Sequence, residues 1–283
     1  MKAQMINPML NKEFKLRFRT IKSFLAILLY LIVLGAIALF FIYMTTRYSS
    51  MGMFRPEQSK SMFMVMAFVQ LALIFFMTPG LTAGVISSER EKQTLNILLT
   101  TQQTSTSIIL SKLGSSLSFL LLIVLSSLPL YSIVFLFGGI SPSLLFITFG
   151  TYLLTMLTLG SIGVFFSTII KKTIVAMICT YGVAFFLAAG TAVLTFFTIA
   201  YTQQGMTTPS TNPAPYFIAM FNPFIYLMLN FEQHFKIEFE TITGITMSLG
   251  IGMLISYLLL SALLIFISIK KLRPNMRPTK RKG

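Results

Sequence analysis

The chain has 283 residues, of which 55% are hydrophobic and only 10% are charged, and its mean hydropathy is +0.83. Ordinary soluble domains carry about 25% charged residues, so this composition excludes a soluble enzyme and a disordered chain and indicates a polytopic membrane protein. The formal net charge is +15, from 22 Lys and Arg against seven Glu and no Asp. Such an excess indicates either a nucleic-acid partner or positive loops that face the cytoplasm.

The chain is poor in the residues from which catalytic and metal sites are built. Cys179 and His234 are the only residues of their kinds, which leaves few ligands for a metal ion and few partners for a nucleophile–base pair. The sequence has no GxxxxGK[ST] phosphate loop, so we expect that the chain does not bind ATP by that route. We therefore expect no catalytic residues, no metal site and no cofactor on this chain.

Six apolar segments are each long enough to cross a hydrocarbon core, which takes about 20 residues in a helix. Their hydrophobic runs are continuous rather than alternating, which favours helices over the strands of a barrel. We predict a single all-α polytopic transmembrane domain over residues 1–283. The predicted spans are residues 23–44, 62–83, 113–137, 144–170, 173–201 and 245–269. Pro79 and Pro129 lie inside two of these spans and are expected to kink them.

Lys and Arg are distributed unevenly among the segments that flank the spans. Eighteen lie before the first span, between the second and third, between the fourth and fifth, or after the sixth, and four lie in the other loops. The positive-inside rule then predicts that both termini are cytoplasmic. When the Glu residues are included, the whole net charge falls on the cytoplasmic side, so we expect no nucleic-acid partner.

The stretch before the first span has the pattern of a basic amphipathic helix. Leu10, Phe14, Phe18 and Ile21 fall on one arc of a helix at 100° per residue. An adjacent arc carries Lys12, Lys15 and Arg19. We predict an interfacial helix with its apolar face in the lipid and its cations near anionic headgroups.

Residues 86–101, between the second and third spans, have the pattern of a short helix. Ser88 and Glu91 have capping-box spacing. Leu95, Leu98 and Leu99 follow as an apolar stripe. Such a helix either packs under its own bundle or docks into a groove on a soluble partner, and the spacing leaves both alternatives open.

The segment between the fifth and sixth spans contains a strongly apolar run over residues 216–231. Asn222-Pro223 interrupts this run, which makes it too short to span a membrane. A pair of short re-entrant or interfacial helices fits the pattern.

Two of these segments resemble a known family. The sequence ISSEREKQTLNILLTT, followed by Lys112, is similar to the cytoplasmic signature of the permeases of type-2 ATP-binding-cassette (ABC) exporters, and NPMLNKEFKLRFR resembles their opening interfacial helix. The resemblance covers essentially the whole chain. Lys92-Gln93 departs from it where many members have Gly or another small residue, and Gln102-Gln103 where many have Pro. These departures leave the subfamily and the cargo open.

The resemblance implies a function and a set of site residues. In that family the loop after the second span is a coupling helix that sits in a cleft of the ATPase subunit. Carried over to this chain, the ATPase-coupling residues are Glu89, Arg90, Glu91, Thr94, Leu95 and Leu98. The re-entrant pair closes an outer gate, here at Phe221, Asn222, Pro223 and Phe224. The implied partners are a cytosolic ABC ATPase dimer, which binds ATP and Mg²⁺, and a second permease subunit, identical or different, in a bacterial plasma membrane.

The spans also bear on the cargo and on the competing functions. They contain no ionisable residue away from their ends, which argues against an ion-coupled secondary carrier. A lining rich in Phe and Met suits an amphiphilic cargo such as a lipid, a hydrophobic peptide or an apolar drug. The alternatives to a transporter subunit are a secondary carrier or channel and a membrane immunity or assembly factor without transport activity.

Overall fold

The computed structural model describes residues 21–48, 56–95, 104–136, 138, 140–203 and 211–272. Within these ranges the regular structure is entirely helical, which confirms the all-α prediction. Six stretches are long and apolar enough to span a membrane, and they indicate a multi-pass membrane protein. The predicted interfacial helix lies outside the described residues, except for Ile21 at the start of the first helix.

The six membrane-length helices match the six predicted spans. They are α2 (Ile21–Tyr48), α3 (Pro56–Thr82), α6 (Ser105–Ser126) with α7 (Leu128–Leu136), α8 (Pro142–Ile169), α9 (Thr173–Phe185) with the π-helix η1 (Phe186–Gly190) and α10 (Thr191–Gln203), and α14 (Leu249–Leu272). Two helices extend beyond the predicted spans, because α3 begins at Pro56, before residue 62, and α6 at Ser105, before residue 113. Most of the first residues of both helices are polar or charged. Hydropathy detects only apolar runs, so it does not include these residues in a helix.

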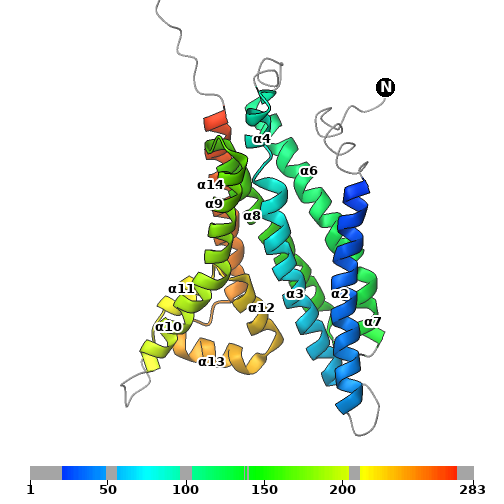
Figure 1. Ribbon diagram of the computed structural model, residues 1–283. Coiled ribbons are helices and arrows are strands. Elements are labelled where there is room, and N and C mark those ends of the chain that lie inside the picture. Colours follow the sequence, from blue (N-terminus) through cyan, green and yellow to red (C-terminus); the bar gives the residue numbers. More distant parts are fainter. Residues whose placement is uncertain are drawn as a thin grey trace, which may run out of the picture.

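The short helices lie at the two ends of the bundle (Figure 1). Helix α4 (Ser87–Glu91) lies at the same end as the start of α2 and the end of α14. Helices α11 (Ala214–Ala219), α12 (Pro223–Phe231) and α13 (Gln233–Thr243) lie toward the opposite end. We refer to these as the α4 end and the α13 end.

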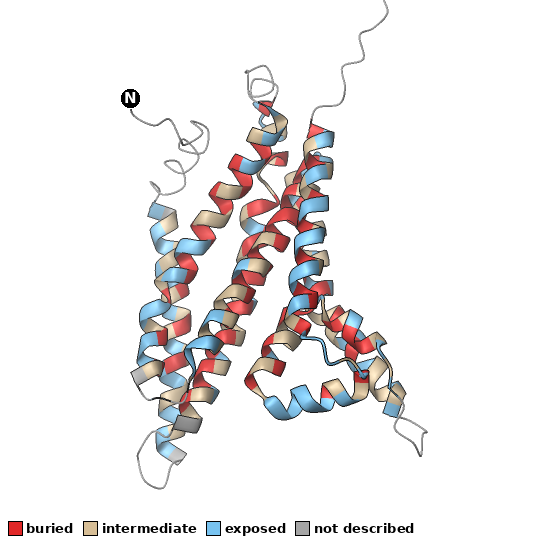
Figure 2. Ribbon diagram, turned by 180° about the vertical axis from the view of Figure 1, so that it is seen from behind, coloured by how far each residue is buried: buried red, intermediate tan, exposed pale blue. Residues whose placement is uncertain are grey.

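Helix α8 is the central element, and it packs against α3, α6, α9 and α14. Buried residues face the interior, while large apolar side chains on the outer faces of α2, α9 and α14 are exposed (Figure 2). In α8 itself, Thr151, Thr155 and Ser161 donate hydrogen bonds to carbonyl oxygens four residues earlier. These hydroxyl groups are therefore satisfied without water, as an apolar environment requires.

A buried polar cluster stabilises the break between α6 and α7. The break falls at Ser127, two residues before Pro129, where the sequence predicts a kink. Ser127 and Tyr131 both donate hydrogen bonds to Oε1 of Gln70 on α3, at 3.2 and 2.5 Å. The side chain of Gln70 thus holds the two halves of the third membrane-length helix against the second.

Gly163 permits a close approach between α8 and the end of α3. A Cβ atom added there would lie 2.0 Å from Oγ1 of Thr82 and 3.1 Å from the backbone nitrogen of Ala83. The first distance is far below van der Waals contact, and the second is a tight contact with backbone. Only a residue without a side chain fits between α8 and the end of α3 from which α4 follows.

We predict that Gly163→Ala destabilises the protein by about 1–3 kcal/mol, because the added methyl group must push α8 away from α3. The measurement is the apparent Tm of the detergent-solubilised protein. The matched control is Gly150→Ala on the same helix, where nothing lies within 4 Å of the added Cβ. Equal Tm values for the two variants would contradict the prediction.

Candidate functional site

A short helix, α4, is present in the segment 86–101, but it covers only Ser87–Glu91, and its N-terminus is not capped as the sequence predicts. The N-cap residue is Ile86, and no side chain of the helix itself makes a capping hydrogen bond. Instead, the backbone N–H groups of Ile86 and Ser87 donate to Oγ of Ser167 on α8, at 2.8 and 2.9 Å. The capping box of Ser88 with Glu91 was therefore wrong, because a neighbouring helix supplies the acceptor.

Glu89 of α4 forms an ion pair with Lys112 of α6. The distance between Nζ of Lys112 and Oε1 of Glu89 is 2.6 Å, and the Lys112 side chain is only 5% exposed. Lys112 was placed in a loop by the sequence analysis, but it lies two turns inside α6. A buried ammonium group requires a close partner, and Glu89 provides it.

Arg90 and Glu91 bind the two ends of the connection between α8 and α9. The Arg90 guanidinium donates to the carbonyl oxygens of Thr168, at 3.0 Å, and Ile170, at 3.5 Å. The Glu91 carboxylate accepts hydrogen bonds from the backbone N–H and the hydroxyl group of Thr173, at 2.9 and 2.7 Å. These bonds hold the pKa of the exposed Glu91 carboxyl below its usual value. Glu91 thus occupies the N-terminus of α9, where the helix dipole favours an anion.

The residues that follow α4 comprise one buried leucine and an exposed segment, which we call the tip. Leu95 is 6% exposed and belongs to an apolar cluster with Ile108 of α6 and Val164 of α8. Lys92, Gln93 and Thr94 are exposed. Gln93 has a φ of +57°, which is a left-handed conformation that Gly adopts most easily. Leu98 lies outside the described residues.

Helix α4 and the residues up to Leu95, which we call the α4 turn, are therefore attached to three membrane-length helices at once. Glu89, Arg90 and Glu91 contact α6, the end of α8 and the start of α9, respectively. The sequence singles out these charges but not the residues that hold the turn, which are Lys112 and Thr173 for Glu89 and Glu91, and Ser167 for the backbone N-terminus of α4. Lys112 carried the only available signal, a cation close to a span end. Ser167 and Thr173 are common residues, and nothing in the local sequence distinguishes them.

The four predicted gate residues lie at the turn between α11 and α12, where Asn222 is fully buried. Its Oδ1 atom accepts from the backbone N–H groups of Phe224 and Ile225, at 2.9 and 3.0 Å, and so caps α12. Pro223 follows as the first residue of α12. An Asn-Pro pair often begins a helix. The Asn side chain accepts hydrogen bonds from two backbone N–H groups that have no other partner, and Pro has no N–H group to satisfy.

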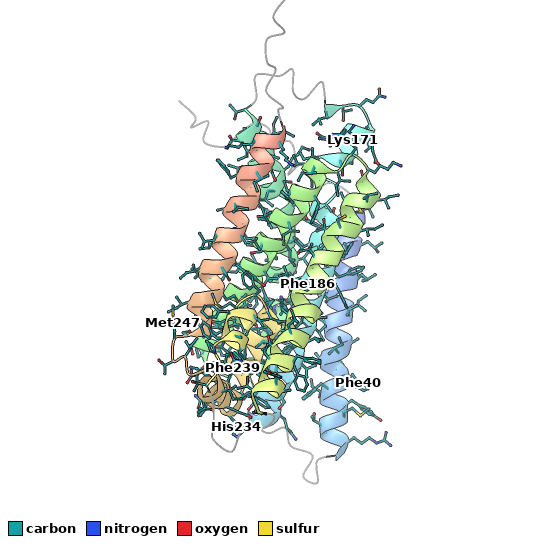
Figure 3. All side chains as sticks on the ribbon, turned by 90° about the vertical axis from the view of Figure 1, so that its left-hand side faces the viewer. Phe40, Lys171, Phe186, His234, Phe239 and Met247 are labelled. Atoms are coloured by element: carbon teal, nitrogen blue, oxygen red, sulfur yellow. The ribbon has the colours of Figure 1, made fainter. Side chains whose placement is uncertain are left out.

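The other end of the Asn222 amide binds the π-helix of the fifth membrane-length helix. Nδ2 of Asn222 donates to the carbonyl oxygen of Ala188, at 2.7 Å, and to Oγ1 of Thr191, at 2.9 Å. A π-helix disrupts the regular pattern of backbone hydrogen bonds and is common at functional sites. Phe186, the first residue of η1, lies near mid-height of the bundle, between Lys171 at the α4 end and His234 at the α13 end (Figure 3). The α11–α12 turn therefore reaches the middle of the fifth helix.

Phe221 and Phe224 connect this turn to other helices. The carbonyl oxygen of Phe221 accepts a hydrogen bond from the hydroxyl group of Tyr257 on α14, at 2.9 Å. The ring of Phe224 packs against Phe75 and Phe68 of α3, with centroid distances of 5.3 and 6.2 Å. The turn is thus held by α3, by the fifth helix and by α14.

The sequence analysis did not predict α13, which follows α12 directly. Its residues alternate charged and apolar side chains over a short distance, which had no clear helical signature. In the part of the chain that the structure describes, no three His, Cys or Glu residues lie together in a metal-binding group. No protein-family model matches the chain, and no curated protein matches it.

We predict that Lys112→Met lowers the free energy of unfolding by about 2–4 kcal/mol, because Glu89 then keeps a partly buried charge without its partner. Glu89→Gln combined with Lys112→Met should recover much of this loss. The apparent Tm of the purified variants measures both effects, with the exposed Lys92→Met as the control. Equal losses for the double variant and for Lys112→Met would contradict the role of the ion pair.

We predict that Asn222→Ala destabilises the α11–α12 turn by about 1–3 kcal/mol, because it leaves two backbone donors and the Ala188 carbonyl without partners. The matched control is Asn230→Ala, whose amide donates, within the described residues, to the carbonyl oxygen of Tyr226 on its own helix. Hydrogen exchange of residues 214–231 measures local opening. Faster exchange in the Asn222 variant is the expected result, and equal exchange in the two variants would contradict it.

Proposed function

We propose that the chain is the membrane-spanning permease subunit of an ATP-driven ABC transporter, of the type-2 exporter class. In this proposal the α4 end faces the cytoplasm, and α4 docks on a separate cytosolic ATPase dimer that binds ATP and Mg²⁺. Two permease subunits, identical or different, form the pathway in a bacterial plasma membrane. The cargo is an amphiphilic or hydrophobic compound.

The observation that carries the proposal is the attachment of α4 to three membrane-length helices. A coupling element must be accessible to its partner and rigidly connected to the helices that it moves. Lys92, Gln93 and Thr94 form an exposed tip, and Glu89, Arg90 and Glu91 connect that tip to α6, α8 and α9. In addition, this loop is the segment that resembles the coupling signature of type-2 exporters.

The backbone conformation of Gln93 is consistent with the signature, although the residues Lys92-Gln93 depart from it. Many members have Gly or another small residue at Lys92-Gln93, and the φ of +57° at Gln93 is one that Gly adopts without strain. The backbone therefore has the shape that Gly favours, even though this chain has Gln.

The proposal also gives a route from α4 to the proposed outer gate. Glu91 holds the first residue of α9, and the same membrane-length helix continues into η1, where Asn222 binds Ala188. A displacement of α4 would move the start of α9, and Asn222 would pass that movement to the α11–α12 turn. In this proposal α11 and α12 form the re-entrant pair that closes the pathway.

We expect that purification of the full chain in mild detergent, from membranes of the organism that carries its gene, recovers an ATPase subunit with a phosphate loop. Lys92→Glu combined with Gln93→Arg should reduce that recovery by about tenfold or more, since reversed charge at an interface costs at least about 1.4 kcal/mol. The measurements are the amount of ATPase recovered and the ATP hydrolysis of the complex.

The matched control is Gln203→Arg, which changes an exposed residue at the α13 end. Leu95 is unsuitable for this test, because it is buried and its substitution would disturb the fold. An unchanged apparent Tm shows that the double variant is folded. Failure to recover any ATPase with a phosphate loop, or equal recovery by the double variant, would refute the proposal and favour a carrier, a channel or an immunity factor.

A further inference from the structure

An apolar cavity of about 390 Å³, open on one side, lies between α10, α12 and α13. This volume falls within the range of small-molecule sites. Each helix lines the cavity with residues three or four positions apart, which places them on one face. Representative residues are Phe196 and Ile199 of α10, Ile225 and Met228 of α12, and Phe235 and Phe239 of α13.

Helix α13, which forms one wall of this cavity, is held at both of its ends. Just before α13, Glu232 forms an ion pair with Lys60 of α3, at 3.3 Å. Near the end of α13, the carbonyl oxygen of Ile242 accepts a hydrogen bond from the backbone nitrogen of Asn212, at 2.9 Å. Helix α13 then ends at Gly244 in a left-handed conformation, with a φ of +67°. The cavity is therefore a preformed feature of the fold.

Among the described residues, Glu238 is the only ionisable residue that lines the cavity, and it is exposed. It lies on α13 between Phe235 and Phe239, so a carboxylate interrupts an otherwise apolar face. Within the described residues its side chain has no ion pair and no hydrogen bond, whereas nearby Glu240 is paired with Lys236, at 3.9 Å. An apolar site with a single unpaired carboxylate complements a ligand with an apolar body and one positive charge.

We propose that this cavity binds a hydrophobic cation, with the positive charge beside Glu238 and the apolar body against α10 and α12. The aromatic rings of Phe196 and Phe235 favour a cation over an anion, because the faces of such rings are electron-rich. Phe196 is 72% exposed, and a ligand would cover part of this apolar surface. This site does not depend on the proposed ATP-driven transport, so the two proposals can fail separately.

The test is binding of tetraphenylphosphonium to the full chain in phosphatidylcholine nanodiscs, measured by equilibrium dialysis. We expect saturable binding that weakens at least about fivefold in Glu238→Gln, which corresponds to about 1 kcal/mol. Tetraphenylborate, an anion of the same shape, should bind more weakly than the cation to the wild type and should gain affinity in Glu238→Gln.

Two further variants distinguish the contribution of the carboxylate to binding from the contribution of the apolar cavity. Glu240→Gln, two residues away on the same helix, should leave tetraphenylphosphonium binding unchanged. Ala192→Phe, which adds a ring to the α10 side of the cavity, should weaken the binding of both ions while the apparent Tm stays within a few degrees of the wild type.

Three results would overturn the proposal. The first is no saturable binding of tetraphenylphosphonium above that of empty nanodiscs. The second is equal affinity of the wild type and Glu238→Gln. The third is a combination of two observations. Native mass spectrometry shows a phospholipid with an amine headgroup bound to the wild type but not to Glu238→Gln, and tetraphenylphosphonium does not bind. That result would identify the cavity as a lipid site.

Discussion

Polar groups inside an apolar bundle must find their partners within the protein, because no water is available to them. At three interruptions of the membrane-length helices, a buried side chain supplies hydrogen bonds from within the protein. Ser167 of α8 accepts from the N-terminus of α4, Gln70 of α3 binds the break between α6 and α7, and Asn222 binds the π-helix in the fifth helix. In every case the side chain comes from a different helix, so each interruption also fixes how two helices pack.

The same constraint explains the charges of the α4 turn. Lys112 is buried inside α6 and pairs with Glu89, while Arg90 and Glu91 satisfy the end of α8 and the start of α9. These residues therefore stabilise the turn itself, and they leave Lys92, Gln93 and Thr94 as the surface available to a partner. A charge that contacts a partner and a charge that holds a surface helix in place have the same sequence signature. Their roles differ only in what lies beside them.

The α13 end of the bundle differs from the α4 end, because apolar surface is left uncovered there. Helices α10, α12 and α13 converge without filling the space between them, and one carboxylate faces that space. Asn222 sits where this region meets the middle of the fifth helix. The α13 end therefore combines a turn that is fixed by many hydrogen bonds with a cavity whose single charged residue is unpaired within the described residues.

The sequence by itself determined the class of the fold and the number and approximate limits of the six membrane-length helices. Hydropathy predicts these features because the cost of placing a segment in lipid is nearly a sum over its own residues. It also singled out Glu89 to Glu91 and the Asn222-Pro223 break. Only the tertiary structure decided what these residues bind, since Lys112, Thr168, Thr173 and Ala188 lie far away along the chain. It alone also revealed α13 and its cavity, because a cavity is defined by three helices together and by no local pattern in any one of them.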